Sequence, residues 1–444
     1  SEIPEVFAKA FYIAKSGRPG PVLIDITKDA QFELFDYKYS KCKGIRSYNP
    51  LPTISNSSID NAVELINNAK NPFIVWGQGV ILGNAEKEFK DFVEKSGIPA
   101  AWTILGLSAL PTSHELNVGM VGMHGNYGPN ILTNKCDLLI AIGMRFDDRV
   151  TGDPKSYASQ AKIIHLDIDP AEINKNIKVD VPVIGDCKES LKLITNKIQK
   201  KSYDKWISRF DDLMKIEFEK VINSDLNPKK DGITMGESII AINEFTNGDA
   251  IIVTDVGQHQ MVACRYANFI KSKSNITSGG LGTIGFALPA AMGAKIAMPD
   301  RDVACVTGEG SIQMMLQELS TMLQYSTPVK IINLNNGYLG MVRQWQEFFY
   351  EKRYAMSYMD ALPDFVKLAE SYGHIGIKVE KESDLKPALV EAFKQKDRTV
   401  FLDILTDPTE NVFPMIPAGG AHRDMLLAGR DQMVSKDETD FNAV

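Results

Sequence analysis

The sequence predicts an α/β protein with two doubly wound parallel-sheet domains, preceded by a short helix–strand unit. Apolar segments of strand length alternate with segments of helical periodicity through most of the 444 residues, as is typical of parallel sheets covered by helices. The alternation occurs twice, on either side of a charged segment at residues 201–232. Several apolar segments end in glycine-rich or polar turns, which is the pattern expected at the ligand-binding edge of such a sheet.

We therefore divide the chain into six parts. They are an N-terminal helix–strand unit (1–35), a linker (36–55), a middle domain (56–200), a connector (201–232), a second α/β domain (233–410) and a C-terminal arm expected to be flexible (411–444).

The composition excludes several classes of protein. The net charge of −7 gives no support for binding to nucleic acid or to an anionic membrane. No apolar run approaches the roughly 20 residues of a membrane span, and the N-terminal residues lack a signal-peptide pattern. The cysteines are scattered and never spaced CxxC, which favours free thiols in a reducing compartment; they are Cys42, Cys136, Cys187, Cys264 and Cys305.

The first 35 residues predict one helix, from Val6 to Ser16, followed by a turn and an apolar strand from Pro21 to Ile26. A lone helix and strand cannot bury their own apolar faces. We therefore expect this unit to dock on another structure or to be disordered. After the linker, Ile59 to Ala69 predicts an amphipathic helix with Ser58 or Asp60 as its N-cap.

The middle domain contains five predicted strands, which are Phe73–Trp76, Ala100–Thr103, Leu138–Ile142, Ile163–Ile168 and Val181–Ile184. The turn Gly77-Gln78-Gly79 lacks the third glycine of a dinucleotide fingerprint. Arg145 and Asp147 follow a predicted strand, where they could form a solvated salt-bridge cluster or part of a nucleotide site. His124 could likewise cap a loop or contact a ligand.

The connector predicts a helix with apolar residues on one side, which are Trp206, Phe210, Leu213 and Phe218. In the second domain we expect strands at Ile251–Asp255, Val303–Val306, Lys330–Leu334 and Phe401–Ile404. One continuous helix is expected from Ile312 to about Gln324, with an apolar face formed by Ile312, Met315, Leu316, Leu319 and Leu323.

Two strand ends of the second domain could form a metal site. Glu309 lies in a glycine turn directly after one strand, and Asn336 follows the next. Because parallel strands end at the same edge of a sheet, the two side chains could meet there. Carboxylate, amide and backbone carbonyl oxygens suit Mg²⁺ when a phosphate supplies further ligands, and the glycine turn offers N–H groups to a diphosphate.

The turn Gly308-Glu309-Gly310-Ser311, followed by Asn335-Asn336, resembles the thiamine-diphosphate signature, with Glu309 where that family normally has Asp. The segment from Gly340 to Gln346 is similar to the catalytic subunit of acetohydroxyacid synthase (acetolactate synthase), and the resemblance covers nearly the whole chain. It implies decarboxylation of pyruvate and transfer of the two-carbon unit to pyruvate or 2-oxobutyrate, in branched-chain amino-acid biosynthesis. The implied cofactors are thiamine diphosphate, Mg²⁺ and FAD.

The resemblance also implies particular site residues. Glu309, Asn336 and the Tyr338 carbonyl would bind the metal. Thiamine diphosphate would contact Val256, Gly257, Gln258, His259, Gly282, Ile284, Gly308, Glu309, Gly310, Ser311, Asn336, Tyr338, Leu339, Gly340 and Met341, with Gln258 and His259 at the diphosphate. FAD would contact Gly77, Gly79, Thr103, Ile104, Met123, His124, Gly143, Arg145, Asp147, Asp167, Asn174 and Asp186.

Three residues would form the substrate pocket. Ile284 stands where the family usually has Met beneath the cofactor, Met341 would line the thiazolium pocket, and Trp345 would select the acceptor. The catalytic glutamate of the family belongs to the pyrimidine-binding domain, of which residues 1–35 resemble only the last helix and strand. No catalytic residue is therefore assigned here, and low activity is expected for the isolated chain. Glu309 is one methylene longer than Asp, so we expect the metal site to shift, to weaken or to prefer Mn²⁺.

The family implies a homodimer or homotetramer, often with a small regulatory subunit, in the bacterial cytoplasm or in an organelle if a targeting segment was lost. Two alternatives stay open at this point. One is another thiamine-diphosphate decarboxylase or carboligase, and the other is a non-catalytic cofactor-binding fragment.

Overall fold

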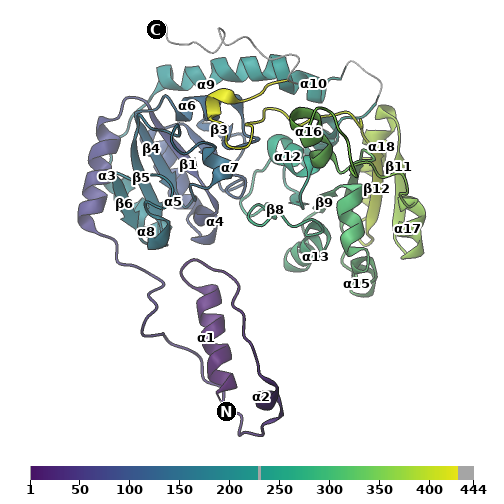
Figure 1. Cartoon of the computed structure of the whole chain (residues 1–444), viewed down its shortest axis with the longest axis horizontal. Coiled ribbons are helices and arrows are strands. Elements are labelled where there is room, and N and C mark those ends of the chain that lie inside the picture. The colour runs from purple at the N-terminus through teal and green to yellow at the C-terminus, as the bar shows by residue number, and fades with distance from the viewer. Residues whose placement is uncertain (1, 229–231, 429–444) are drawn as a thin grey trace.

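The computed structural model describes residues 2–228 and 232–428, which contain two six-stranded sheets (Figure 1). The paired strands of both sheets run parallel, as the predicted fold class requires. The first sheet has the order β3-β2-β1-β4-β5-β6. Its strands are β1 (Pro72–Trp76), β2 (Ala100–Trp102), β3 (Asn117–Met120), β4 (Leu138–Ile142), β5 (Lys162–Asp167) and β6 (Val181–Ile184).

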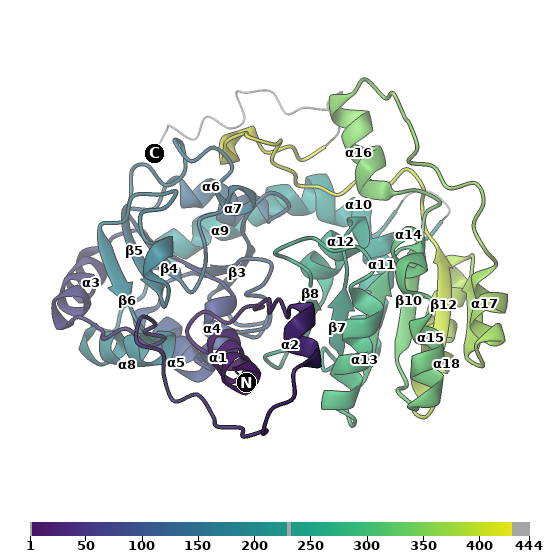
Figure 2. The same ribbon diagram turned by 60° about the horizontal axis from the view of Figure 1, so that its bottom comes forward.

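Helices cover the first sheet on both sides (Figure 2). One group packs together as α3, α5 and α8, and α6 packs with the connector helix α9. The helices of this domain are α3 (Asn56–Asn68), α4 (Gln78–Leu82), α5 (Glu86–Ser96), α6 (Tyr127–Thr133), α7 (Asp148–Thr151), η1 (Pro170–Glu172) and α8 (Cys187–Lys197). Helix α3 begins after Ser55, whose Oγ accepts from Ser58 N at 3.4 Å. The predicted N-caps, Ser58 and Asp60, were wrong because the helix extends further toward the N-terminus.

The second sheet has the order β11-β12-β10-β9-β7-β8. Its strands are β7 (Ile251–Thr254), β8 (Asn275–Thr277), β9 (Val303–Thr307), β10 (Lys330–Asn335), β11 (Ile375–Val379) and β12 (Val400–Leu405). Three strands were not predicted, namely β3, β8 and β11. Each lies at a sheet edge, where a strand is short or half-exposed and carries little apolar signal.

The strands of the second sheet send alternate side chains into two cores, because the side-chain period of a strand is two. On β9, Val303 and Cys305 pack with α13, whereas Ala304 and Val306 face the opposite core. The covering helices are α11 (Met235–Thr246), α12 (Gln258–Tyr266), α13 (Ala287–Ala297), α14 (Glu309–Ile312), η3 (Gln313–Met315), α15 (Glu318–Gln324), α16 (Gly340–Phe349), α17 (Phe365–Ser371) and α18 (Glu382–Lys394).

The single helix predicted from Ile312 to Gln324 is divided. A 3₁₀ turn at Gln313–Met315 separates α14 from α15. Ile312 and Leu319 are buried as expected, but Leu323 is exposed and Met322 takes its place in the core. The predicted apolar face is therefore correct at Leu319, beyond the turn, and wrong only in the last turn of α15.

The connector forms α9 (Asp204–Glu217), the π-helical turn η2 (Phe218–Ile222) and α10 (Asn223–Leu226). Trp206, Phe210 and Leu213 are buried as predicted, whereas Phe218 is exposed. The wider turn at η2 shifts the apolar side of the helix, and Val221 is buried instead.

The N-terminal segment contains α1 (Ile3–Lys15) and α2 (Lys28–Phe32) and extends away from both sheets in Figure 1. The strand predicted at Pro21–Ile26 does not form, and Leu23 is 93% exposed. None of the described strands lies beside it to supply ladder hydrogen bonds, which an isolated strand needs. Arg18 links the segment to the middle domain through Glu172 Oε1 at 2.6 Å and Asp169 Oδ2 at 3.1 Å.

The C-terminal segment from residue 411 to 428 is ordered against both domains, contrary to the predicted flexible arm. Met415 and Ile416 are buried, and Met415 forms a bridge with Leu426. Both ring nitrogens of His422, in η4 (His422–Asp424), lie within 3.0 Å of middle-domain carbonyl oxygens. The remainder of the predicted arm, residues 429–444, lies outside the described residues. Within the described part of the chain, no helix has the length and apolar character needed to cross a membrane.

Candidate cofactor and substrate site

Three strands of the second sheet bring the predicted metal and diphosphate residues to one edge. Strand β9 leads through Gly308 into Glu309, β10 leads into Asn336, and β7 leads into α12, which begins at Gln258. The neighbouring strand order β10-β9-β7 places these three turns side by side. Ser311 Oγ donates to Val256 O at 3.5 Å and so connects two of the turns.

Glu309 is a buried carboxylate with one unsatisfied oxygen. The residue is 1% exposed, and its Oε1 has no hydrogen-bond partner among the described residues. Burial raises the pKa of Glu309 to about 7, although hydrogen bonds from the backbone of Glu309, Tyr338 and Asn336 and the nearby His259 act in the opposite direction. An unpaired buried carboxylate is unfavourable unless a cation balances it, so this oxygen fits a metal ligand.

Asn336 presents a second oxygen at the same edge. Its Oδ1 accepts from Tyr338 N at 3.1 Å and keeps one lone pair free, while its Nδ2 donates to Gln258 Oε1 at 3.1 Å. Among residues 2–228 and 232–428, no group of three or more His, Cys, Asp or Glu side chains is arranged to hold a metal. The donor set at this edge is therefore one carboxylate supported by amide and carbonyl oxygens, as Mg²⁺ uses beside phosphate.

His259 lies in a space formed by two glycines. Its Nε2 donates to Asp255 Oδ1, and Asp255 Oδ2 accepts from Thr307 Oγ1 at 3.1 Å. A Cβ on Gly257, whose φ is +154°, would lie 2.8 Å from His259 Nδ1, and one on Gly308 would lie 3.1 Å from it. Asp255 thus fixes the ring so that Nδ1 lies against the two turns, where α12 and α14 begin.

The side-chain amide of Gln258 donates its hydrogen bonds within the protein. Its Nε2 donates to Gln344 Oε1 at 3.0 Å and to the Glu410 carbonyl at 2.9 Å. Both N–H groups of the amide are therefore occupied within the protein. At this position only the backbone N–H at the start of α12 remains available for a diphosphate.

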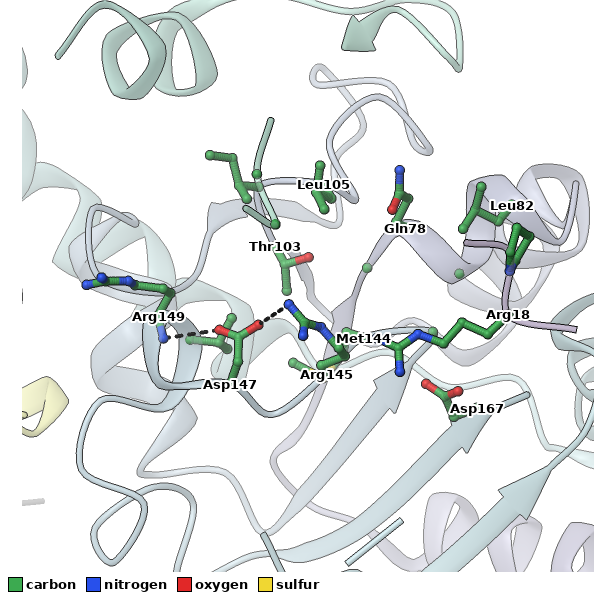
Figure 3. Close-up of a pocket in the computed structure, with 18 of the residues that line it drawn as sticks. Arg18, Gln78, Leu82, Thr103, Leu105, Met144, Arg145, Asp147, Arg149 and Asp167 are labelled. Atoms are coloured by element: carbon green, nitrogen blue, oxygen red, sulfur yellow. Dashed lines mark hydrogen bonds and ion pairs between the residues drawn. The ribbon is translucent and has the colours of Figure 1, made fainter. Parts of the chain in front are cut away.

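A cavity of about 1010 Å³ lies between the two domains, at the strand ends of the first sheet (Figure 3). Eleven of the twelve predicted flavin residues line it, namely Gly77, Gly79, Thr103, Ile104, Met123, His124, Gly143, Arg145, Asp147, Asp167 and Asp186. Asn174 does not line it. Asn174 is exposed and its Oδ1 accepts from Val179 N at 2.8 Å, which stabilises its own loop.

The polar groups of the cavity have two kinds of environment. Arg145 pairs with Asp147 at 3.2 Å and remains partly exposed (Figure 3). His124 is buried, and burial together with the Arg265 charge lowers its pKa to about 4, so its ring is neutral at neutral pH. Burial also raises the pKa of Asp167.

The cavity continues to the second domain. Met341 and Trp345 on α16 line it together with Val256, Gly257 and Gly282. Ile284 does not line it, and lies 45% exposed in the loop that follows β8. The structure thus brings Met341 and Trp345 to the same cavity as the predicted flavin residues, and leaves Ile284 at the surface of the described chain.

Several lining residues were not predicted. Arg18, Arg149, Gln260 and Met261 belong to this group. Arg18 and Asp167 lie at one end of the cavity and Arg149 lies at the other (Figure 3). Arg149 follows Asp147 by only two positions and could have been included. The approach of Arg18 depends instead on how the N-terminal segment folds back.

The comparisons with known proteins agree with this geometry. Residues 59–194 match the central domain of thiamine pyrophosphate enzymes, and residues 255–404 match their C-terminal TPP-binding domain. The fold and the site therefore define a thiamine-diphosphate-dependent enzyme.

Individual relatives define the family within that class. The acetolactate synthase large subunit of Buchnera aphidicola subsp. Schizaphis graminum is 43% identical over 438 residues, covering 97% of this chain and 76% of that protein. The acetolactate synthase isozyme 3 large subunit of Escherichia coli (strain K12) is 41% identical over 435 residues, covering 96% and 75%. The large subunit of Haemophilus influenzae is 41% identical, with 96% and 75% covered. The chain belongs to the acetolactate synthase large-subunit family.

Proposed function

We propose that this chain performs the acetohydroxyacid synthase reaction. Pyruvate is decarboxylated, and its two-carbon unit is transferred to pyruvate or 2-oxobutyrate to give 2-acetolactate or 2-aceto-2-hydroxybutyrate. The observation that carries the proposal is the unsatisfied Oε1 of buried Glu309 at the strand edge that the TPP-binding domain supplies.

Glu309 Oε1, Asn336 Oδ1 and the Tyr338 carbonyl would hold Mg²⁺. The burial of Glu309 supports its role as a ligand. The hydrogen bond from Tyr338 N to Asn336 Oδ1, 3.1 Å long, supports the role of Asn336. The metal would join the protein oxygens to the diphosphate, since Mg²⁺ binds few protein ligands together with phosphate.

The turns around His259 would hold the diphosphate. Backbone N–H groups at the start of α12, a helix of nine residues, point toward the edge and favour a phosphate. The residues that would form this cradle are Val256, Gly257, Gln258, His259, Gly308, Gly310 and Ser311. Leu339 packs on Gly310, where a Cβ would lie 2.8 Å from Leu339 Cδ2. The Leu339 side chain therefore covers this turn.

Bound thiamine diphosphate would supply the carbanion chemistry and accept the electrons released with CO₂. The residues of this chain would orient substrates and exclude water. Met341 and Trp345 present apolar surface to the cavity, and the Trp345 ring is placed by Phe349, with centroids 5.2 Å apart. We assign Trp345 to acceptor selection, Met341 to the reacting face, and Gly282, Ile284 and Gly340 to the periphery of the cofactor.

FAD would occupy the part of the cavity between the first sheet and the N-terminal segment. The eleven predicted residues that line the cavity include two glycine turns and both signs of charge, which suits a large nucleotide. The net reaction is not a redox reaction, so the flavin would be structural. We also propose a homodimer or homotetramer, and association with a small regulatory subunit.

The direct test is binding followed by turnover. Thiamine diphosphate is titrated into the protein with and without Mg²⁺, and the bound flavin is released by denaturation and identified by absorbance. Metal-dependent thiamine diphosphate binding and a released flavin are expected. Absence of both after reconstitution would exclude the proposal.

Turnover of the 444 residues alone is expected to be low. The general base implied by the family lies in the pyrimidine-binding domain, and acid–base catalysis typically contributes about 10²–10⁴-fold. Adding that domain from a matched relative should restore formation of 2-acetolactate from pyruvate. High turnover without it would show that another group in the chain acts as the base.

A further inference from the structure

Three buried amide side chains form a continuous hydrogen-bonded relay. Asn336 Nδ2 donates to Gln258 Oε1 at 3.1 Å, Gln258 Nε2 donates to Gln344 Oε1 at 3.0 Å, and Gln344 Nε2 donates to Val412 O at 3.1 Å. The three residues are 6%, 3% and 0% exposed, respectively. We call Asn336, Gln258 and Gln344 the amide relay.

The backbone of Val412 fixes the direction of the relay. Its N–H donates to Gln344 Oε1 at 2.8 Å, and its carbonyl accepts from Gln344 Nε2. A backbone N–H can only donate and a carbonyl can only accept, so Gln344 has one permitted orientation. Gln344 Oε1 and the Glu410 carbonyl, 2.9 Å from Gln258 Nε2, are both hydrogen-bond acceptors. Gln258 must therefore turn its Nε2 toward them and its Oε1 away.

Two contacts fix the orientation of Asn336: Tyr338 N donates to its Oδ1 at 3.1 Å, and Gln258 Oε1 accepts from its Nδ2 at 3.1 Å. Because Gln258 presents Oε1, Asn336 must turn its Nδ2 toward it and its Oδ1 away from it. A reversed Asn336 would direct an N–H group at the cation and would lose a metal ligand. We propose that Gln258 and Gln344 are positioning residues that hold the Asn336 oxygen toward the metal, an inference that rests on the proposed metal site.

The position of Gly340 supports the relay independently. A Cβ at this first residue of α16 would lie 2.0 Å from Gln258 Oε1 and 2.9 Å from Asn336 Nδ2. Alanine is the better residue within a helix, yet here the Gln258–Asn336 hydrogen bond occupies the volume that its methyl group needs. The glycine is therefore explained by the first link of the relay.

The test measures metal affinity directly. Mn²⁺ is titrated into the protein in the presence of thiamine diphosphate, and the free ion is counted by its electron paramagnetic resonance signal. In Gln258→Met the dissociation constant should rise about 10- to 100-fold, the usual effect of losing a group that supports a metal ligand. Gln324→Met makes the same chemical change at an exposed site and should leave the constant unchanged.

A double-mutant cycle separates orientation from general destabilisation. In an Asn336→Asp background both branches of the side chain end in oxygen, so no orientation is left to fix. Gln258→Met should then cause no loss of Mn²⁺ affinity. If it causes the same loss in both backgrounds, the relay does not act by orienting Asn336 and the inference is wrong.

Failure of the relay can be distinguished from failure of the proposed function. If the unmodified protein does not bind Mn²⁺ with thiamine diphosphate, the metal site itself is wrong. If the unmodified protein binds and Gln258→Met binds equally well, only the relay is overturned. Should Gln258→Met not fold, as judged by circular dichroism, Gln344→Met keeps Gln258 in contact with Glu410. A smaller loss of affinity is then expected, which must also vanish in the Asn336→Asp background, and an unchanged affinity overturns the inference.

Discussion

The two sheets share one architecture, but the side chains at their strand ends differ in burial. At the second sheet, Asn336 and Gln258 are buried and hydrogen-bonded, and Glu309 Oε1 alone is left unpaired among them. At the first sheet, the Arg145 and Asp147 side chains are 43% and 31% exposed and line an open cavity. A small cation requires a few fixed oxygens, whereas a large nucleotide requires volume and distributed polar contacts. The tightly packed turns of the second sheet therefore suit the proposed metal ion, and the open turns of the first sheet suit the proposed nucleotide.

The largest effect is expected at the second sheet, from Glu309→Gln. The substitution keeps the shape of the side chain and removes the charge that would balance the metal. Mn²⁺ affinity in the presence of thiamine diphosphate should fall by more than about 100-fold, beyond the range for supporting groups. The flavin released on denaturation should be unchanged, and equal metal affinity would contradict the assignment of Glu309.

The converse change at the first sheet is Gly143→Ala. Gly143 has a φ of +57°, and a Cβ there would lie 2.6 Å from Gly79 Cα. The left-handed conformation alone costs about 1–2 kcal/mol for a residue with a Cβ, and the overlap would displace the turn. We expect loss of bound flavin and a lower melting temperature, with thiamine diphosphate binding retained.

Gly293→Ala is the matched control for this variant. Gly293 lies inside α13, and a Cβ added there would meet no heavy atom within 4 Å beyond the backbone of its own helix. Alanine should stabilise that helix by up to about 1 kcal/mol, so the melting temperature should rise or stay constant. If Gly143→Ala retains its flavin, binding does not depend on the close approach of the turns at Gly79 and Gly143.

Trp345→Leu tests the place where the cavity reaches the second domain. Trp345 lines the cavity from α16, and loss of its ring face should reduce preference for 2-oxobutyrate over pyruvate. One small apolar group is worth about 1–3 kcal/mol in discrimination, so the product ratio should change about 10-fold. Direct competition between the two acceptors, in the enzyme completed with the pyrimidine-binding domain, is the measurement. Phe218→Leu, on the exposed side of the connector, should leave the ratio unchanged.

The smallest effect is expected at the connector between the two domains, from Asp225→Asn. Burial raises the pKa of Asp225 to about 6, although Tyr266 and Arg265 oppose the shift. The folded state then holds this proton more tightly than the unfolded state, so stability falls as pH rises from about 4 to 6. After allowance for partial exposure, the contribution is about 1 kcal/mol. Urea unfolding measures the free energy of unfolding at each pH, and this decline should be absent in Asp225→Asn. If the variant and the unmodified protein decline in parallel, Asp225 does not cause the decline.

Much of the fold followed from the sequence because its central strands are uninterrupted apolar segments. Leu138–Ile142, a central strand, was predicted with its observed bounds, and so was the apolar edge strand Val181–Ile184. The edge strands β3, β8 and β11 were missed because their exposed side carries polar residues. The strand expected at Pro21–Ile26 has the right composition but lacks a neighbour, which local sequence cannot show.

The site was predictable where it depends on strand ends and not where it depends on folding back of the chain. Glu309 and Asn336 could be placed at one edge because parallel strands end together. The hydrogen bonds of Gln258 to Gln344 and Glu410 join residues 86 and 152 positions apart, and no local pattern indicates them. The same reason explains why Arg18 was not expected in the cavity and why residues 411–428 were taken for a flexible arm.

The C-terminal segment has a consequence for the order in which the protein matures. During synthesis the N-terminal parts of a chain emerge and fold first. The amide of Gln258 reaches its carbonyl partner only after 152 further positions have been made, and Val412 follows later still. Strand β12, which pairs with β10 beside Asn336, ends at Leu405, only five positions before Glu410. The last strand next to Asn336 and the residues that set the amide's direction are therefore made almost together. At the proposed metal site, the oriented Asn336 oxygen would therefore be completed late in biosynthesis, together with the last strand of its sheet.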